Sequence, residues 1–188
     1  MLTFTTESFA RLENAARALA SAHWDEVEAP LHGPGRYALD AGRYALLERL
    51  GMLHISAARC AGGMAGHPRG ALAGYAAFTL VDCPHLPGTR LAALDGLYLA
   101  PWARGGLAAL SLLRHAERAL IRRGAGLVQY SSPESRPCDA LYRRLGARPT
   151  ERVWHKRLEA APPPRGEGVL RESAPQSPDG TEAVPPRS

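Results

Sequence analysis

The sequence has few cysteines, almost no lysine and no long apolar run. Its three cysteines, Cys60, Cys83 and Cys138, are far apart and form no Cys-x-x-Cys pair. This spacing excludes a disulfide framework and a zinc site, and it indicates a reducing compartment. The longest nearly apolar stretch, Ala71–Val81, is too short to span a bilayer. Residues 1–10 lack a basic start and an apolar run, so we expect no signal peptide, no membrane partner and a cytoplasmic protein.

The positive charge of the chain comes almost entirely from arginine, because Lys156 is the one lysine among 23 basic residues. A net charge of +5 is compatible with nucleic-acid binding. The arginines are spread along the chain instead of clustering with aromatic residues, however. We therefore favour an arginine-biased genome and a cofactor that carries phosphates over a nucleic-acid partner.

The last part of the chain differs in composition from the rest. Ala161–Ser188 contains seven prolines and no aromatic residue. Such a segment cannot bury enough apolar surface to offset the entropy lost on ordering. We expect one domain over residues 1–160, followed by a disordered tail over residues 161–188.

Residues 1–160 show two helix patterns, then three strand patterns, then alternating helices and strands, which together predict an α+β fold, an α/β sandwich with helices flanking one mixed sheet. We expect Thr6 or Ser8 to cap the first helix, and Glu26–Arg36, with two prolines and two glycines, to form a loop. The predicted helices are Phe9–His23, Asp40–Arg49, Leu107–Arg123 and Cys138–Leu145. The predicted strands are Leu2–Thr6, Met52–Arg59, Ala71–Val81, Arg90–Leu99, Leu127–Ser131 and Val153–Leu158.

The most informative segment joins the predicted strand that ends at Leu99 to the long helix that begins at Leu107. Arg104, Gly105 and Gly106 lie between them. The first N–H groups of a helix have no partner within the helix, and the helix dipole favours negative charge there. Glycine lets a phosphate approach the backbone closely. The segment therefore predicts a pyrophosphate site.

Arg104–Ala109 resembles the Gln/Arg-x-x-Gly-x-Gly/Ala signature of the GNAT acetyltransferases, which binds the pyrophosphate of acetyl-CoA. The first and last positions match, whereas Leu107 stands where the family usually has glycine, with Gly106 one residue earlier. Asp139–Gly146 is similar to the family's Leu-Tyr-x-x-Leu-Gly-Phe signature, and Trp154–Leu158 is similar to its closing strand. The first half, with His23-Trp24, Tyr44–Gly51 and Cys83–His85, resembles small family members encoded by phages.

The resemblance implies a GNAT-like fold that uses acetyl-CoA as co-substrate, without a metal, to acetylate an amine on a small molecule or a protein. Many members dimerise, so a homodimer is possible. Backbone groups at the end of the strand are expected to bind pantetheine, those of the glycine turn are expected to bind pyrophosphate, and Ser135 stands where many members have asparagine. The implied cofactor-binding residues are Leu97, Tyr98, Leu99, Arg104, Gly105, Gly106, Leu107, Ala108, Ala109 and Ser135.

The resemblance also implies catalytic residues. Tyr142 is the expected acid for the departing thiolate, although a tyrosine on a short helix is otherwise a core residue. Asp95 is one candidate base, because it points to the same face as Ala93, where the family often has a carboxylate. A structural hydrogen bond would explain Asp95 equally well. His85, in a loop beside the same strand, is the second candidate base, although loop histidines are usually only solvated. His23 and Glu26 could line the acceptor site.

Two other functions stay open at this stage. One is a catalytically inactive acyl-CoA-binding or accessory protein with the same fold, since Ala93, Leu107 and Ser135 all depart from the family pattern and a fold does not establish an activity. The other is a nucleic-acid-binding module. The seven histidines and three cysteines show no metal-ligand spacing.

Overall fold

The structure is a computed structural model that describes residues 1–33 and 37–156. It contains two compact units, Met1–Pro149 and Thr150–Ser188. In the second unit the described residues, 150–156, form neither helix nor strand. The first unit contains the strands β1 (Leu2–Thr6), β2 (Leu53–Cys60), β3 (Leu72–Asp82), β4 (Arg90–Leu99) and β5 (Ala125–Gln129). Its helices are α1 (Phe9–His23), the π-helix η1 (Trp24–Glu28), α2 (Ala29–His32), α3 (Ala41–Arg49), the 3₁₀ helix η2 (Pro101–Ala103), α4 (Ala108–Arg122) and α5 (Asp139–Arg144).

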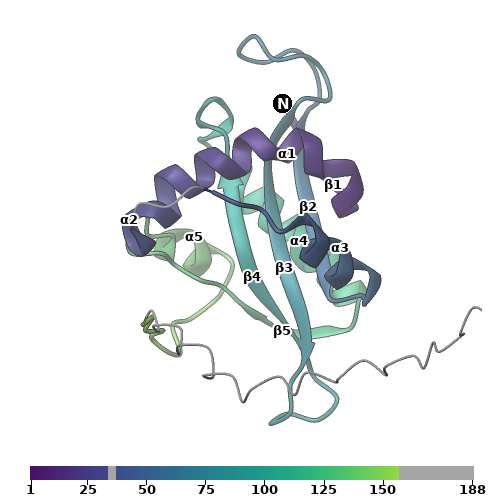
Figure 1. Ribbon diagram of the computed structural model, residues 1–188, viewed down its shortest axis with the longest axis vertical. Helices are drawn as coiled ribbons and strands as arrows, with labels where there is room; N and C mark the ends of the chain where they lie inside the picture. The colour runs from purple at the N-terminus through teal and green to yellow at the C-terminus, as the bar shows by residue number, and fades with distance from the viewer. Residues whose placement is uncertain (34–36, 157–188) are drawn as a thin grey trace, which may run out of the picture. The chain divides into compact units, whose positions relative to one another are not determined.

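The five strands form one sheet in the order β1-β2-β3-β4-β5 (Figure 1). The first four strands are antiparallel neighbours, whereas β5 runs parallel to β4. A parallel neighbour needs a crossover connection, and α4 provides it. This mixed sheet with flanking helices confirms the predicted α+β class.

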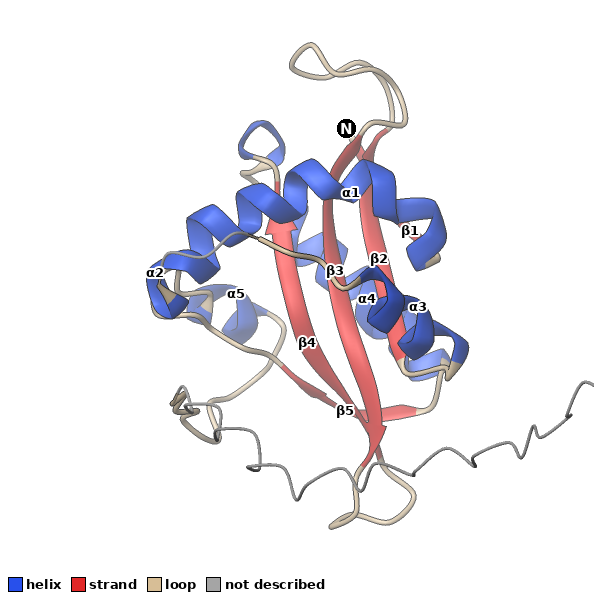
Figure 2. Cartoon of the chain, in the orientation of Figure 1, coloured by secondary structure: helices blue, strands red, loops and turns tan. Residues whose placement is uncertain are grey.

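Helices cover both faces of the sheet (Figure 2). One face packs against α4, whose Leu112, Leu113 and Leu120 are fully buried together with Phe78 of β3. The helical spacing of these leucines places them on a single stripe facing the sheet. The other face, on the near side in Figure 2, packs against α1 and α3 around Leu12. Because each face is covered by its own helices, a ligand bound on one face of the sheet is separated by the sheet from a ligand bound on the other.

The pairing between strands β4 and β5 ends halfway along β4. Their pairing in the described chain runs from Arg90 to Ala93, after which β4 continues to Leu99 and β5 ends at Gln129. A β-bulge lies just beyond this point, because β3 residues 77 and 78 pair with Gly96 and Leu94 and leave Asp95 as the extra residue. Bulges bend a strand and redirect side chains. The far half of β4 thus has a backbone edge that β5 does not cover.

The predicted loop after the first helix is wrong over Glu26–His32. The chain continues as η1 and then α2, and Pro30 falls in the first turn of α2, where its missing N–H is not needed. Gly33, with φ of 83°, follows the last helical residue. Residues 34–36 lie outside the described residues.

Two further local predictions need correction. Ser8 is the N-cap residue of α1, but its side chain makes no capping bond; the Phe9 N–H donates to Glu48 Oε1 at 2.7 Å. The predicted strand at 153–158 is wrong over Val153–Lys156, which form no strand. A strand needs a paired neighbour and a buried face, and Trp154 is 87% exposed. Residues 157–158 and the predicted tail lie outside the described residues.

Candidate active site

The glycine turn has the backbone geometry that its sequence predicts. Gly105 and Gly106 have φ of 110° and 53°, in a region of backbone conformation that residues other than glycine rarely adopt. Leu107 follows with φ of −105°, so this position does not require glycine. Its side chain is 60% exposed. The turn delivers the chain into α4, whose first N–H groups lack carbonyl partners within the helix. These residues fit a pyrophosphate group.

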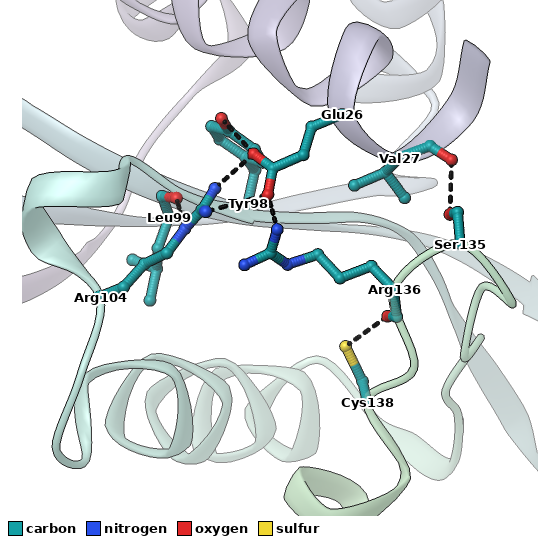
Figure 3. A network of polar contacts seen from close by, with 8 residues as sticks. All are labelled: Glu26, Val27, Tyr98, Leu99, Arg104, Ser135, Arg136 and Cys138. Carbon is teal, nitrogen blue, oxygen red and sulfur yellow. Dashed lines mark hydrogen bonds and ion pairs between the residues drawn. The ribbon is translucent and has the colours of Figure 1, made fainter. Parts of the chain in front are cut away.

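Arg104, the first residue of the signature, is held by a carboxylate from a distant part of the chain (Figure 3). Its Nη1 and Nη2 donate to Glu26 Oε1 and Oε2 at 2.9 and 2.6 Å, and its Nε donates to the Leu99 carbonyl at 2.8 Å. The guanidinium also lies 5.1 Å from the ring centroid of Tyr98, whose hydroxyl donates to Glu26 at 3.0 Å. The side chain of Arg104 thus fixes the turn to β4 and η1.

The segment between β5 and α5 joins the same network (Figure 3). Arg136 forms an ion pair with Glu26. Ser135 donates to the Val27 carbonyl at 2.7 Å, so its hydroxyl has a protein partner in this arrangement. Glu26 therefore connects η1, the glycine turn and the segment before α5. Its role depends on η1, which the sequence did not indicate.

Tyr142 projects from α5 to the end of β5. It is 7% exposed, stacks on Tyr130 with ring centroids 4.7 Å apart, and donates to the Ser131 carbonyl at 2.7 Å. Because Ser131 is the second residue after β5, this hydroxyl lies near the end of β5, beyond which β4 has no parallel neighbour among the described residues. Burial raises the pKa of Tyr142, so the phenol is protonated at neutral pH.

A cavity of about 420 Å³ lies on the other face of the sheet, between α1, the segment 37–40, α3 and strands β2 to β4. Asp95 and Gly96 of β4 line it, together with His23 at the end of α1. Asp95 accepts a hydrogen bond from the Tyr44 hydroxyl at 2.6 Å. The bulge in β4 places Asp95 at the mouth of this cavity, with its side chain exposed, and so the structure brings one of the predicted bases to a candidate binding site.

His23 lies beside Asp95 in the same cavity. Its Nδ1 is 2.9 Å from the Tyr75 hydroxyl, its ring stacks on Tyr98 at 5.3 Å between centroids, and its Nε2 is 3.9 Å from Glu28. Burial lowers the pKa of His23, while Glu28 and Asp95 oppose that shift. The ring is therefore neutral at neutral pH and can accept a proton.

His85, the other predicted base, is not brought to this site. It lies exposed in the turn between β3 and β4, at the start of β4, whereas the glycine turn follows the other end (Figure 1). Asp95 lies five residues beyond Arg90, the first residue of β4, which corresponds to about 16 Å along a strand. Two loop prolines beside His85 show that it is in a turn, but they carry no information on which end of the strand is functional.

The described residues contain neither a group of three or more histidine, cysteine, aspartate or glutamate side chains placed to hold a metal ion nor a helix long and apolar enough to cross a membrane. The side chains that surround the two candidate binding regions are instead carboxylates, tyrosines, arginines and one neutral histidine. These groups can bind phosphate, orient an amine and transfer protons.

The sequence matches no family model and no curated protein. Solved structures do resemble it. A ribosomal-protein-alanine N-acetyltransferase from Brucella melitensis biovar Abortus 2308 superimposes with a TM-score of 0.60 and 18% identity, covering 85% of this chain and all of that one (100%).

Two other structures show the same likeness. AAC(6')-Iy, in complex with the bisubstrate analog CoA-S-monomethyl-acetylneamine, has a TM-score of 0.56 and 18% identity over 85% of this chain and 99% of its own. A transcriptional regulator from Bacillus halodurans C-125 has a TM-score of 0.64 and 16% identity over 84% of this chain and 100% of its own. The expected architecture is confirmed: the chain has the fold of the GNAT acetyltransferases.

Proposed function

We propose that the protein transfers an acetyl group from acetyl-CoA to an amine. The observation that carries this proposal is the placement of two chemically different sites on either side of β4. The glycine turn and the uncovered edge of β4 offer backbone donors and acceptors to a phosphate-bearing cofactor. The cavity on the opposite face holds a carboxylate and a neutral histidine. The CoA analog bound by AAC(6')-Iy supports the assignment of the first site.

Acetyl-CoA supplies a thioester, whose carbonyl carbon is the electrophile. Backbone N–H groups of Arg104–Ala109 bind the pyrophosphate, with Leu107 adding its N–H despite its side chain. Backbone groups of Leu97, Tyr98 and Leu99 pair with pantetheine along the uncovered edge of β4. Ser135 and the carbonyl of Leu99 already have protein partners, so we expect their contacts to the cofactor to be minor.

An acceptor amine in water is mostly protonated, because its pKa is about 10.4 for a lysine-like group. In our proposal His23 takes one proton from the ammonium, and Asp95 orients the amine through its second oxygen. The amine nitrogen then forms a bond to the carbonyl carbon, the bond from that carbon to sulfur breaks, and the sulfur leaves with the electron pair. The nitrogen loses its second proton to solvent water as the amide forms, and a proton from solvent replaces the one that the sulfur later receives.

Tyr142 serves the leaving sulfur. Its hydroxyl must turn from the Ser131 carbonyl toward the sulfur, which is possible by rotation about one bond. Because its pKa is raised, Tyr142 keeps its proton until charge develops on the sulfur and stabilises that charge by a hydrogen bond. The released thiol receives its proton through this group.

Calorimetric titration of acetyl-CoA into the full chain tests this proposal. Micromolar binding is expected for the unchanged protein. Leu107→Glu should abolish it, because a carboxylate at the start of α4 repels pyrophosphate while favouring the helix itself. Leu86→Glu is the matched control, since Leu86 is 52% exposed in the turn that contains His85. Absence of binding by the unchanged protein would exclude acetyl transfer from acetyl-CoA.

A further inference from the structure

The cavity beside Asp95 has the size and the walls of a small-molecule site. Its volume of about 420 Å³ is within the range of pockets that enclose drug-sized ligands. Most of its wall is apolar, including Leu12, Ile55 and Ala77. Five aromatic side chains add flat surfaces: Phe9, Trp24, Tyr37, Tyr44 and Tyr75. An occupant of this space would meet mainly carbon atoms in the cavity wall.

The charge of the cavity is opposite to that of the chain. The chain carries a net charge of +5, whereas the cavity is lined by four carboxylates, Glu13, Glu28, Asp40 and Asp95, and by one guanidinium, Arg17, which pairs with Glu13 at 3.4 Å. His23 does not neutralise this negative charge at neutral pH, because burial lowers its pKa. A cation is therefore favoured inside this cavity over an anion or a neutral molecule.

Asp95 is the carboxylate best placed to meet a cationic head group. It accepts one hydrogen bond, from Tyr44, whereas a carboxylate can accept about four. The neighbouring Gly96 lets the rings of His23 and Tyr75 lie close to the strand: a Cβ there would lie 3.4 Å from His23 Cε1 and 3.6 Å from Tyr75 Cε2. An ammonium group at Asp95 would be next to the proposed base, at the bulge in the middle of β4.

From these observations we infer that the acceptor is a small primary amine, cationic in solution, on an apolar or aromatic body. The inference rests on the proposed function and narrows it. The ammonium group lies at Asp95, and the body packs between α1 and the aromatic side chains, with a cation–π contribution from the tyrosines. A polyhydroxylated amine fits less well, because the apolar wall would leave its hydroxyl groups without partners.

Calorimetry on the full chain with three probes tests the inference directly. Phenethylamine carries the charge and the aromatic body, phenethyl alcohol lacks the charge, and glucosamine lacks the apolar body. We expect phenethylamine to bind about tenfold more tightly than either other probe, as one charge-assisted hydrogen bond would provide. Equal binding of amine and alcohol, or tighter binding of glucosamine, would overturn the inference without any variant.

Asp95→Asn locates the cation. It should weaken phenethylamine binding about tenfold and leave the alcohol unchanged. Asp82→Asn, at the exposed end of β3, is the matched control and should alter neither. Acetylation assays separate the two proposals: if acetyl-CoA does not bind, the proposed function fails, whereas if it binds and only glucosamine or peptide amines are acetylated, the function stands and this inference fails.

Discussion

Glu26 and Arg104 are 78 residues apart in sequence and form a two-bond ion pair, with N to O distances of 2.9 and 2.6 Å. Each side chain is about one quarter exposed. The pair joins a π-helix on one side of β4 to the glycine turn at its end. The main role of Arg104 is therefore to hold the glycine turn in place, and a direct contact with phosphate is secondary.

Arg104→Ala should lower the free energy of unfolding by about 2 kcal/mol, because paired, partly buried charged groups contribute on the order of 1.5–3 kcal/mol per interaction. Tyr98 and Arg136 still contact Glu26, which limits the loss. Urea unfolding measures it. Arg114→Ala, an exposed arginine on α4, is the control and should change stability by less than about 0.5 kcal/mol. Equal stability of the two variants would show that the ion pair contributes nothing.

The backbone of Gly105 provides a second prediction. At φ of 110° an alanine is strained, and such conformations cost about 1–3 kcal/mol. Gly105→Ala should therefore either destabilise the protein by that amount or shift the turn and weaken acetyl-CoA binding. Gly62→Ala is the matched control, because a Cβ there meets nothing within 4 Å and its φ is outside the left-handed region. Urea unfolding measures the stability of both variants, and calorimetry measures their acetyl-CoA binding. Unchanged stability and unchanged binding in Gly105→Ala would contradict the prediction.

A buried histidine away from the site makes stability depend on pH. His54 is 2% exposed, its Nε2 is 2.9 Å from the Ser56 hydroxyl, and its Nδ1 is without a partner within the described chain. Burial, with Arg123 second, lowers the pKa of His54 from 6.5 to about 4. The unfolded chain thus binds a proton more readily than the folded one.

The stability contributed by neutral His54 is complete above pH 6.5 and is lost as the pH falls toward 4. The full difference is about 3 kcal/mol. His54→Gln should flatten this part of the curve when unfolding free energies are measured by urea at several pH values. The pKa of His23 and His115 is also lowered by burial, so the decisive quantity is the difference in slope between the two proteins. Identical slopes would show that His54 does not titrate in this range.

Local chemistry explains what the sequence could predict. The turn at Gly105 and Gly106 can be predicted because its positive φ angles require glycine, so the residue type alone marks the turn. Strands β1 to β5 and most helices follow from apolar spacing, whereas the strand predicted at 153–158 is wrong over Val153–Lys156. The loop prediction at Glu26–His32 is wrong because it rests on two prolines and two glycines, and one of these prolines, Pro30, lies in the first turn of a helix, where a proline costs nothing.

Contacts between distant segments could not be predicted. Nothing near Glu26 indicates that it meets Arg104, and nothing near Asp95 indicates that it meets Tyr44. These contacts depend on the packing of η1 and α3 against the sheet. The sequence could not decide between the two predicted bases, Asp95 and His85, for the same reason, because only the bulge and the direction of β4 determine which of them lies at the cavity.

His23 gives the sharpest test of the proposed chemistry. If it is the base, its neutral form is the active one, so kcat/KM should rise with pH through the pKa of His23 and level off above it. Because burial lowers that pKa, the rise should be centred below pH 6.5. His23→Gln should reduce kcat by about 10²-fold or more, the usual contribution of a positioned base, and should remove this acid limb while acetyl-CoA still binds. His85→Gln, at the other end of β4, should reproduce neither effect. If His85→Gln loses activity while His23→Gln keeps a normal pH profile, the base is His85 and the proposed role of His23 is wrong.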